Sequence, residues 1–173
     1  MKKEHILTFL KVAAYIAMIG YFIEAGSVVF SFCLNWYHSN AEGEFMYHLN
    51  LGEIYAYNKK MYYSAVSLLV ALPVAQALLW WSVIELFPQI NLEKPFDEGL
   101  IAAMNKMIQP LIGYGIIGFI SRHYFEFVEK RTGQLIDPDF DLGLYLFILG
   151  VIVIVTEILK KGLELKNENE LTI

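Results

Sequence analysis

Residues 142–159 read LGLYLFILGVIVIVTEIL, and this stretch decides the fold class of the chain. It contains one charged side chain, Glu157, in an otherwise apolar run. A helix of about 20 apolar residues crosses a hydrocarbon core about 30 Å thick. The sequence therefore predicts a transmembrane helix over residues 142–159.

Three further apolar stretches of comparable character precede this one, at residues 6–32, 61–87 and 108–128. The first is longer than the 7–15-residue core of a signal peptide and ends in no clear cleavage site, so we interpret it as an uncleaved span. We predict an all-α integral membrane protein, an antiparallel four-helix bundle with both termini in the cytoplasm. Residues 1–173 form a single four-span transmembrane domain in this interpretation.

The overall composition favours the same class of protein. Hydrophobic residues make up 57% of the 173 residues, above the roughly 45–50% of soluble domains. The net charge of −5 argues against a surface that binds nucleic acid directly, which requires clustered lysine and arginine. A single cysteine, Cys33, excludes an internal disulfide and thiol chemistry that needs two cysteines.

The distribution of basic residues predicts the orientation in the membrane. With four spans, one side holds eight basic residues: Lys2, Lys3, Lys11, Lys94, Lys106, Lys160, Lys161 and Lys166. The other side holds five: Lys59, Lys60, Arg122, Lys130 and Arg131. Because basic residues favour the cytoplasmic side, we expect both termini there. We expect the protein to be a multi-pass protein of the bacterial plasma (inner) membrane.

The connections between spans carry helix and turn signals. A short helix is expected near Leu49–Tyr57. Asp97 is a good N-cap for an amphipathic helix that continues into the third span and bends near Pro110, and Phe96 is placed to pack on Ile101 as a hydrophobic staple. Turn signals follow at 132–133 and 137–138. Asp139 or Asp141 then caps the fourth span.

Each span carries one ionisable side chain on a face rich in small residues, and small residues mark helix contacts in membranes. The ionisable residues are Glu24, Glu85, Arg122 and Glu157. The predicted contact faces hold these small residues: Ala13, Ala17, Gly20, Ser27 and Ser31 in the first span, Ser64, Ser67, Ala71, Ala75 and Ser82 in the second, Gly115 and Gly118 in the third, Gly143 and Gly150 in the fourth.

Charges inside a membrane normally face the protein interior or a water-filled cavity. One hypothesis pairs Glu24 with Arg122 across the first and third spans, which predicts that Glu24→Gln destabilises the protein in detergent. Lys106, Lys160 or Lys161 would then neutralise Glu85 and Glu157. Two other interpretations stay open: the charges extend into interfacial water, or they form a transport or proton relay.

Signals for catalysis and cofactors are weak. Residues 113–118 match the pattern G-x-G-x-x-G, but they lie inside an apolar helix rather than after a strand, so helix packing explains them better. His38 and His48 lie near Glu42, Glu44 and Glu53 without a compact metal-ligand spacing. We expect no catalytic residues, no metal, no cofactor and no enzymatic activity.

Two segments resemble a known family. The turn Pro95-Phe96-Asp97-Glu98 precedes an amphipathic helix, and residues 161–173 read KGLELKNENELTI. With four spans and this length, the chain resembles the bacterial membrane family called domain of unknown function 2975. The resemblance implies a four-span membrane protein without an established activity. It also implies, as a partner, a cytosolic helix-turn-helix regulator.

The function that we expect is a non-enzymatic regulatory or interaction module in the lipid bilayer. Its partner-docking candidates lie in the 93–107 loop and in the tail, where acidic and apolar side chains alternate: Pro95, Phe96, Glu164, Glu168, Glu170, Leu171 and Ile173. A frayed, solvated tail is the simpler interpretation. The alternative function is a small transporter or a receptor for a lipophilic or small ligand that uses the polar residues within the spans.

Overall fold

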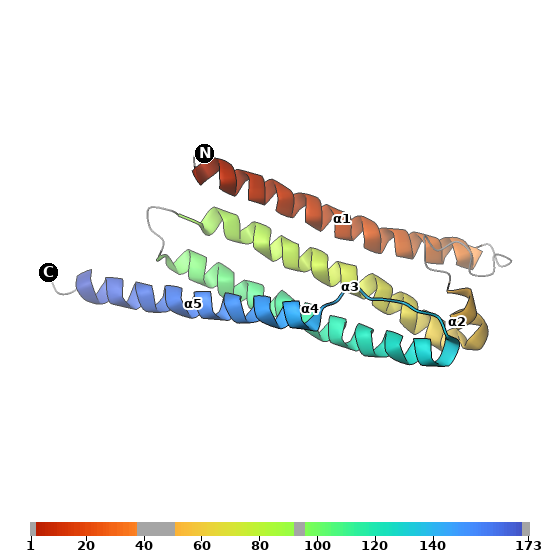
Figure 1. Cartoon of the computed structure of the whole chain (residues 1–173). Helices are drawn as coiled ribbons and strands as arrows, with labels where there is room; N and C mark the ends of the chain where they lie inside the picture. Colours follow the sequence, from red (N-terminus) through yellow and green to blue (C-terminus); the bar gives the residue numbers. More distant parts are fainter. Residues whose placement is uncertain (1–2, 38–50, 92–95, 171–173) are drawn as a thin grey trace.

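A computed structural model describes residues 3–37, 51–91 and 96–170 of the chain (Figure 1). These residues form helices and connecting segments, and no strand occurs among them. The helices are α1 (Lys3–Tyr37), α2 (Gly52–Tyr57), α3 (Lys59–Leu86), the 3-10 helix η1 (Phe87–Gln89), α4 (Glu98–Thr132) and α5 (Leu142–Glu170). The predicted all-α fold is confirmed.

The four long helices contain the four predicted spans and extend beyond them. They are long and apolar enough to cross a membrane. The predicted amphipathic helix and the third span form one continuous helix, α4, with Pro110 inside it. The fourth span likewise continues, so that α5 reaches Glu170 rather than ending near residue 159. The expected short helix is α2, Gly52–Tyr57.

Residues at the helix ends determine where α4 and α5 begin and where α4 ends. The Oδ1 atom of Asp97 accepts a hydrogen bond from the Gly99 amide at 2.8 Å, which confirms Asp97 as the cap of α4. Of the two candidates for α5, Asp141 is the one whose carboxylate accepts from the Leu144 amide, at 3.0 Å. At the far end of α4, Gly133 adopts φ 73°, a left-handed conformation that glycine tolerates and that ends the helix.

The long helices pack in chain order. α1 packs mainly on α3, α3 on α1 and α4, and α5 on α4. Figure 1 shows that the first residues of α1 and the last residues of α5 lie at the same end of the molecule. The central helices α3 and α4 therefore hold most of the buried residues, while α1 and α5 present long apolar faces to the surroundings.

Two apolar clusters hold the helices together. The larger cluster joins α2, α3 and α4 with the segment after α4: Leu51, Ile54, Tyr62, Ala65, Val66, Phe125, Val128 and Ile136. The smaller cluster joins α1 to α3 through Ala14, Met18, Ala77 and Ile84. The Tyr124 hydroxyl also donates to the Met61 carbonyl oxygen at 2.9 Å, which places these two residues of α4 and α3 at one level.

Only some of the small-residue faces predicted from the sequence pack against other parts of the protein. In α4 the prediction is confirmed, because an added side chain at Gly115 or Gly118 would meet the ring of Tyr145 or Phe140. In α1 the buried residues are Ala14, Met18, Ala25 and Ser31, whereas Gly20 and Glu24 are exposed. Ser31 is therefore buried as predicted, while the rest of the face predicted for α1 lies about one position out of register.

In α3, Ala75 and Ser82 are buried as predicted, but Ser64, Ser67 and Glu85 are exposed. In α5, nothing lies within 4 Å of a side chain built on Gly150. Small residues on these helices mark some contacts and leave other positions open.

Candidate functional site

Three of the four ionisable residues of the spans, Arg122, Glu157 and Glu85, interact through their side chains within their own helices. The Arg122 Nε lies 3.4 Å from Oε1 of Glu126, and Lys160 Nζ lies 2.6 Å from Oε1 of Glu157. Glu85 Oε1 accepts a hydrogen bond from Trp81 Nε1 at 2.9 Å. These are contacts three or four residues apart, which the helix itself brings together.

The structure does not bring Glu24 and Arg122 together. Arg122 is paired with Glu126, and Glu24 is exposed on α1. The reason is the packing order, because α1 packs on α3 while Arg122 belongs to α4. Sequence reasoning missed Glu126, although its spacing of four residues from Arg122 is a recognisable ion-pair signal.

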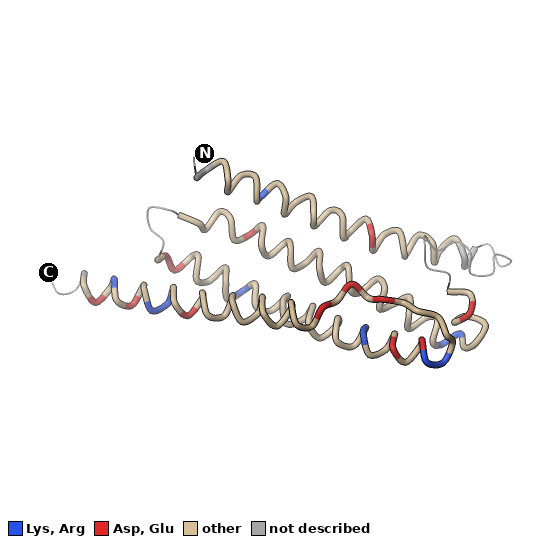
Figure 2. Tube along the Cα trace, viewed as in Figure 1, with Lys and Arg blue, Asp and Glu red and all other residues tan. Residues whose placement is uncertain are grey.

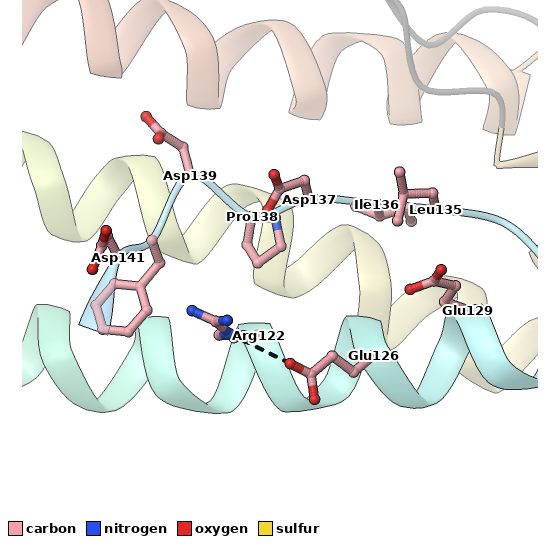
Figure 3. Close-up of a pocket in the computed structure, with 10 residues that line it drawn as sticks. Arg122, Glu126, Glu129, Leu135, Ile136, Asp137, Pro138, Asp139 and Asp141 are labelled. Atoms are coloured by element: carbon pink, nitrogen blue, oxygen red, sulfur yellow. Dashed lines mark hydrogen bonds and ion pairs between the residues drawn. The ribbon is translucent and has the colours of Figure 1, made fainter. Parts of the chain in front are cut away.

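Arg122 lines a pocket of about 530 Å³ between α4 and the segment that leads to α5 (Figure 3). We call residues 134–141 the strap, and this cavity the strap pocket. Its lining contains one guanidinium and five carboxylates: Arg122, Glu126, Glu129, Asp137, Asp139 and Asp141. Figure 2 shows acidic residues along the strap. Within the described part of the chain, no three histidine, cysteine or acidic side chains are arranged to hold a metal ion.

A second cavity lies between the first turns of α4 and the last turns of α5. We call it the tail groove, with a volume of about 360 Å³. The α4 side contributes Glu98, Ile101, Ala102 and Asn105, and the α5 side contributes Lys160, Leu163, Glu164 and Asn167. The groove thus combines apolar side chains with carboxylates, amides and one ammonium group.

The tail groove exists because α5 stays helical beyond its apolar part and packs on the start of α4. A side chain built on Gly162 would meet the ring of Phe96, so glycine allows this close approach. Lys161 Nζ contacts Glu164 Oε2 at 2.6 Å, which supports the helical turn at the groove. The two segments singled out in the sequence for docking are therefore neighbours.

The individual docking candidates fall in different places. Glu164 lines the groove and Phe96 packs beside it on Gly162. Glu168 lies in the last turn of α5, and Glu170 is its last residue. Pro95, Leu171 and Ile173 lie outside the described residues, as do His38, His48, Glu42 and Glu44.

Sequence reasoning missed the residues that complete the groove, above all Asn105 and Asn167. Asn105 is exposed and lines the groove from the α4 side. The available signal was the spacing of Lys160, Leu163, Glu164 and Asn167, which share one helical face. Only the packing of α5 on α4 shows that this face meets Ile101 and Ala102.

Comparison with known proteins identifies a family for this chain. The model of the family described as "Protein of unknown function (DUF2975)" matches residues 50–173. The match includes α2 to α5, and therefore both cavities, but not α1. No curated protein and no solved structure matches the chain.

Proposed function

This chain belongs to the DUF2975 family of proteins of unknown function, and we propose that it is a multi-pass membrane protein that docks a cytosolic partner in its tail groove. Four of its helices are long and apolar enough to cross a membrane, which supports this proposal. The four helices are antiparallel spans, and both termini lie in the cytoplasm. The membrane is the bacterial plasma membrane, as the family resemblance implies. The protein acts by binding rather than by catalysis.

The tail groove is the observation that carries this proposal. Two segments that are 55 or more residues apart, Glu98–Asn105 and Lys160–Asn167, form one cavity of about 360 Å³. The helical tail projects from the end of the last apolar span, where a membrane protein can present it to the cytosol. The groove is therefore in the place where a soluble partner would find it.

The side chains of the groove indicate the chemistry of the partner. Ile101, Ala102 and Leu163 offer apolar contacts, and Glu98 and Glu164 add negative charge. A helix with an apolar face and basic flanks fits such a groove, because apolar anchors give affinity and opposite charges give specificity. A small helix-turn-helix regulator is the partner class that the family resemblance supports.

A photo-crosslinking experiment in intact cells tests the docking site. A photoreactive amino acid replaces Asn167, which lines the groove, or Leu165, which is exposed on the same tail but outside the groove. We expect a defined cytosolic protein to be crosslinked from position 167 and not from position 165. Equal capture at both positions would show that the tail binds without using the groove.

A second experiment fills the groove with a large side chain and compares the result with a matched variant outside it. Ala102 is an exposed groove residue, so Ala102→Trp adds volume there without disturbing the buried core. We expect this variant to abolish crosslinking from position 167, whereas Leu165→Trp leaves it intact. Unchanged crosslinking in Ala102→Trp would contradict the proposal.

The alternative of a transporter gains little support from the carboxylates of the spans. Glu24, Glu85 and Glu157 line neither the strap pocket nor the tail groove. Each of the pairs that involve Arg122 and Glu157 is local to one helix. Docking at the tail groove is therefore the function that we favour.

A further inference from the structure

The strap runs back along the helices instead of staying at their end. It leaves α4 after Gly133 and leads to the start of α5 at Leu142. The ring of Phe140 lies against Gly118, and the ring of Tyr145 lies against Gly115. Both glycines are in the middle part of α4, so the strap returns from the end of α4 to its middle (Figure 1).

The contact at Gly118 sets the depth of the strap. Tyr124 of α4 is level with Met61, next to Lys59 and Lys60 at the start of α3. Gly118 precedes Tyr124 by six residues, which corresponds to about 9 Å along a helix that rises 1.5 Å per residue. If the charged start of α3 marks the membrane boundary, Phe140 lies inside the nearer half of a hydrocarbon core about 30 Å thick. This step rests on the membrane insertion proposed above.

At this depth the strap backbone is chemically exposed. Within the described residues, the backbone amides of Asp137 and Asp139, which lie on the strap between Ile136 and Phe140, donate to no protein acceptor. An unpaired amide is strongly disfavoured in hydrocarbon, which offers it no hydrogen-bond acceptor. Non-helical backbone at membrane depth is therefore tolerated where protein buries it or where it lines a water-filled cavity.

The strap pocket supplies that cavity. It has a volume of about 530 Å³, and at about 30 Å³ per water molecule it has room for more than about ten waters. Asp137, Asp139 and Asp141 on the strap and Glu126 and Glu129 on α4 line it and are exposed. Of these carboxylates, those of Asp139 and Asp141 flank Phe140 and so lie below the level of Tyr124, where they require water because hydrocarbon does not solvate them.

We infer that the strap and α4 enclose a water-filled vestibule. It opens on the side of the membrane opposite the termini and extends about 9 Å below the level of Tyr124, down to the contact between Phe140 and Gly118. Water in the vestibule hydrates the amides and carboxylates of the strap. The vestibule is separate from the tail groove, which lies at the other end of α4.

Cysteine labelling tests the vestibule in a Cys33→Ser background, since Cys33 is the one cysteine of the chain and is exposed. The probe position is Asp139→Cys in the strap. The depth control is Ile120→Cys, which lies within one turn of Gly118 on α4 but is an exposed apolar residue outside the pocket. The boundary control is Tyr57→Cys, an exposed residue of α2 just before α3. Each variant is treated in intact cells, and in inverted membrane vesicles, with a membrane-impermeant maleimide.

On the membrane face where Tyr57→Cys reacts, we expect Asp139→Cys to react within about tenfold of its rate. Ile120→Cys should react at least about 100-fold more slowly, since the thiolate is the nucleophile and an apolar environment suppresses it. Asp137→Cys is a second strap probe with the same expected result, used if Asp139→Cys is not produced.

Two outcomes overturn the vestibule: strap cysteines that stay unlabelled while Tyr57→Cys reacts, or Ile120→Cys labelled as fast as the strap. Failure of the orientation looks different, because Tyr57→Cys would then react only in the inverted vesicles. The strap would still be expected to react on that same face.

Discussion

The strap pocket and the tail groove are both built on α4, yet their second walls differ. In the tail groove the second wall is a helix, the end of α5. In the strap pocket it is the non-helical segment 134–141. Inside a helix the amides and carbonyls bond to one another, so the groove presents mainly side chains. The strap presents backbone groups as well.

This difference separates two kinds of surface on one helix. A groove between two helices offers apolar and charged side chains to another helix, and the backbone inside each helix needs no further hydrogen bonds. A pocket walled by open backbone requires water or a polar ligand. We therefore assign protein docking to the tail groove and hydration to the strap pocket.

The largest expected effect is at the packing contact of the strap. Gly118→Val should displace the ring of Phe140, which is 6% exposed and has little room to move. Overpacking of this kind costs about 1–3 kcal/mol, so the melting temperature in detergent should fall by several degrees. Gly113→Val on the same helix is the control, since nothing lies within 4 Å of an added side chain there. Equal melting temperatures for the two variants would argue against a packed strap.

The corresponding change at the groove should affect binding more than stability. Gly162→Val should displace Phe96, which is partly exposed next to the start of α4 and has room to give way. We expect the melting temperature to stay within a few degrees of wild type, while crosslinking from position 167 is lost. Gly150→Val, on the same helix but without neighbours at that position, should preserve the crosslink. Loss of the crosslink in both variants would mean that the groove geometry is not the cause.

A smaller effect concerns the charge of the strap pocket. Five carboxylates and one guanidinium line the pocket, and a cleft of one sign concentrates ions of the opposite sign. The quantity to compare is the ratio of the reaction rate of a cationic thiol reagent to that of an anionic one. In low salt, this ratio should be about tenfold higher at Leu135→Cys than at Tyr57→Cys. Arg122→Gln should raise this ratio, and added salt should lower it. An identical ratio at both positions would contradict the expected field.

The smallest effect is expected at Glu24. The sequence hypothesis of a Glu24–Arg122 pair predicts that Glu24→Gln destabilises the protein. In the structure Glu24 is exposed and Arg122 contacts Glu126, so we expect a change within about 0.5 kcal/mol. Thermal unfolding in detergent measures it, with Ser27→Ala as a neighbouring control. A loss of several degrees in Glu24→Gln alone would restore the pair hypothesis.

Local signals in the sequence predicted the helices and several of their ends. Asp97, Asp141 and Gly133 act on backbone atoms within a few residues of themselves, so their roles do not depend on the rest of the fold. The contact face of α1 was harder to predict. Neighbouring positions on a helix differ by about 100°, and an apolar residue on a span can face lipid as well as protein. The small-residue pattern thus missed the buried face of Ala14, Met18 and Ala25 by one position.

By itself, the sequence determined four long apolar helices, because length and hydrophobicity decide whether a helix can cross a membrane. It also determined local ion pairs, once their spacing of three or four residues is considered. Only the tertiary structure decided that α5 packs on α4 and that the strap returns to Gly118. These contacts join residues far apart in the chain, and they depend on how whole side chains fit together. The two cavities follow from that fit, which no short stretch of sequence encodes.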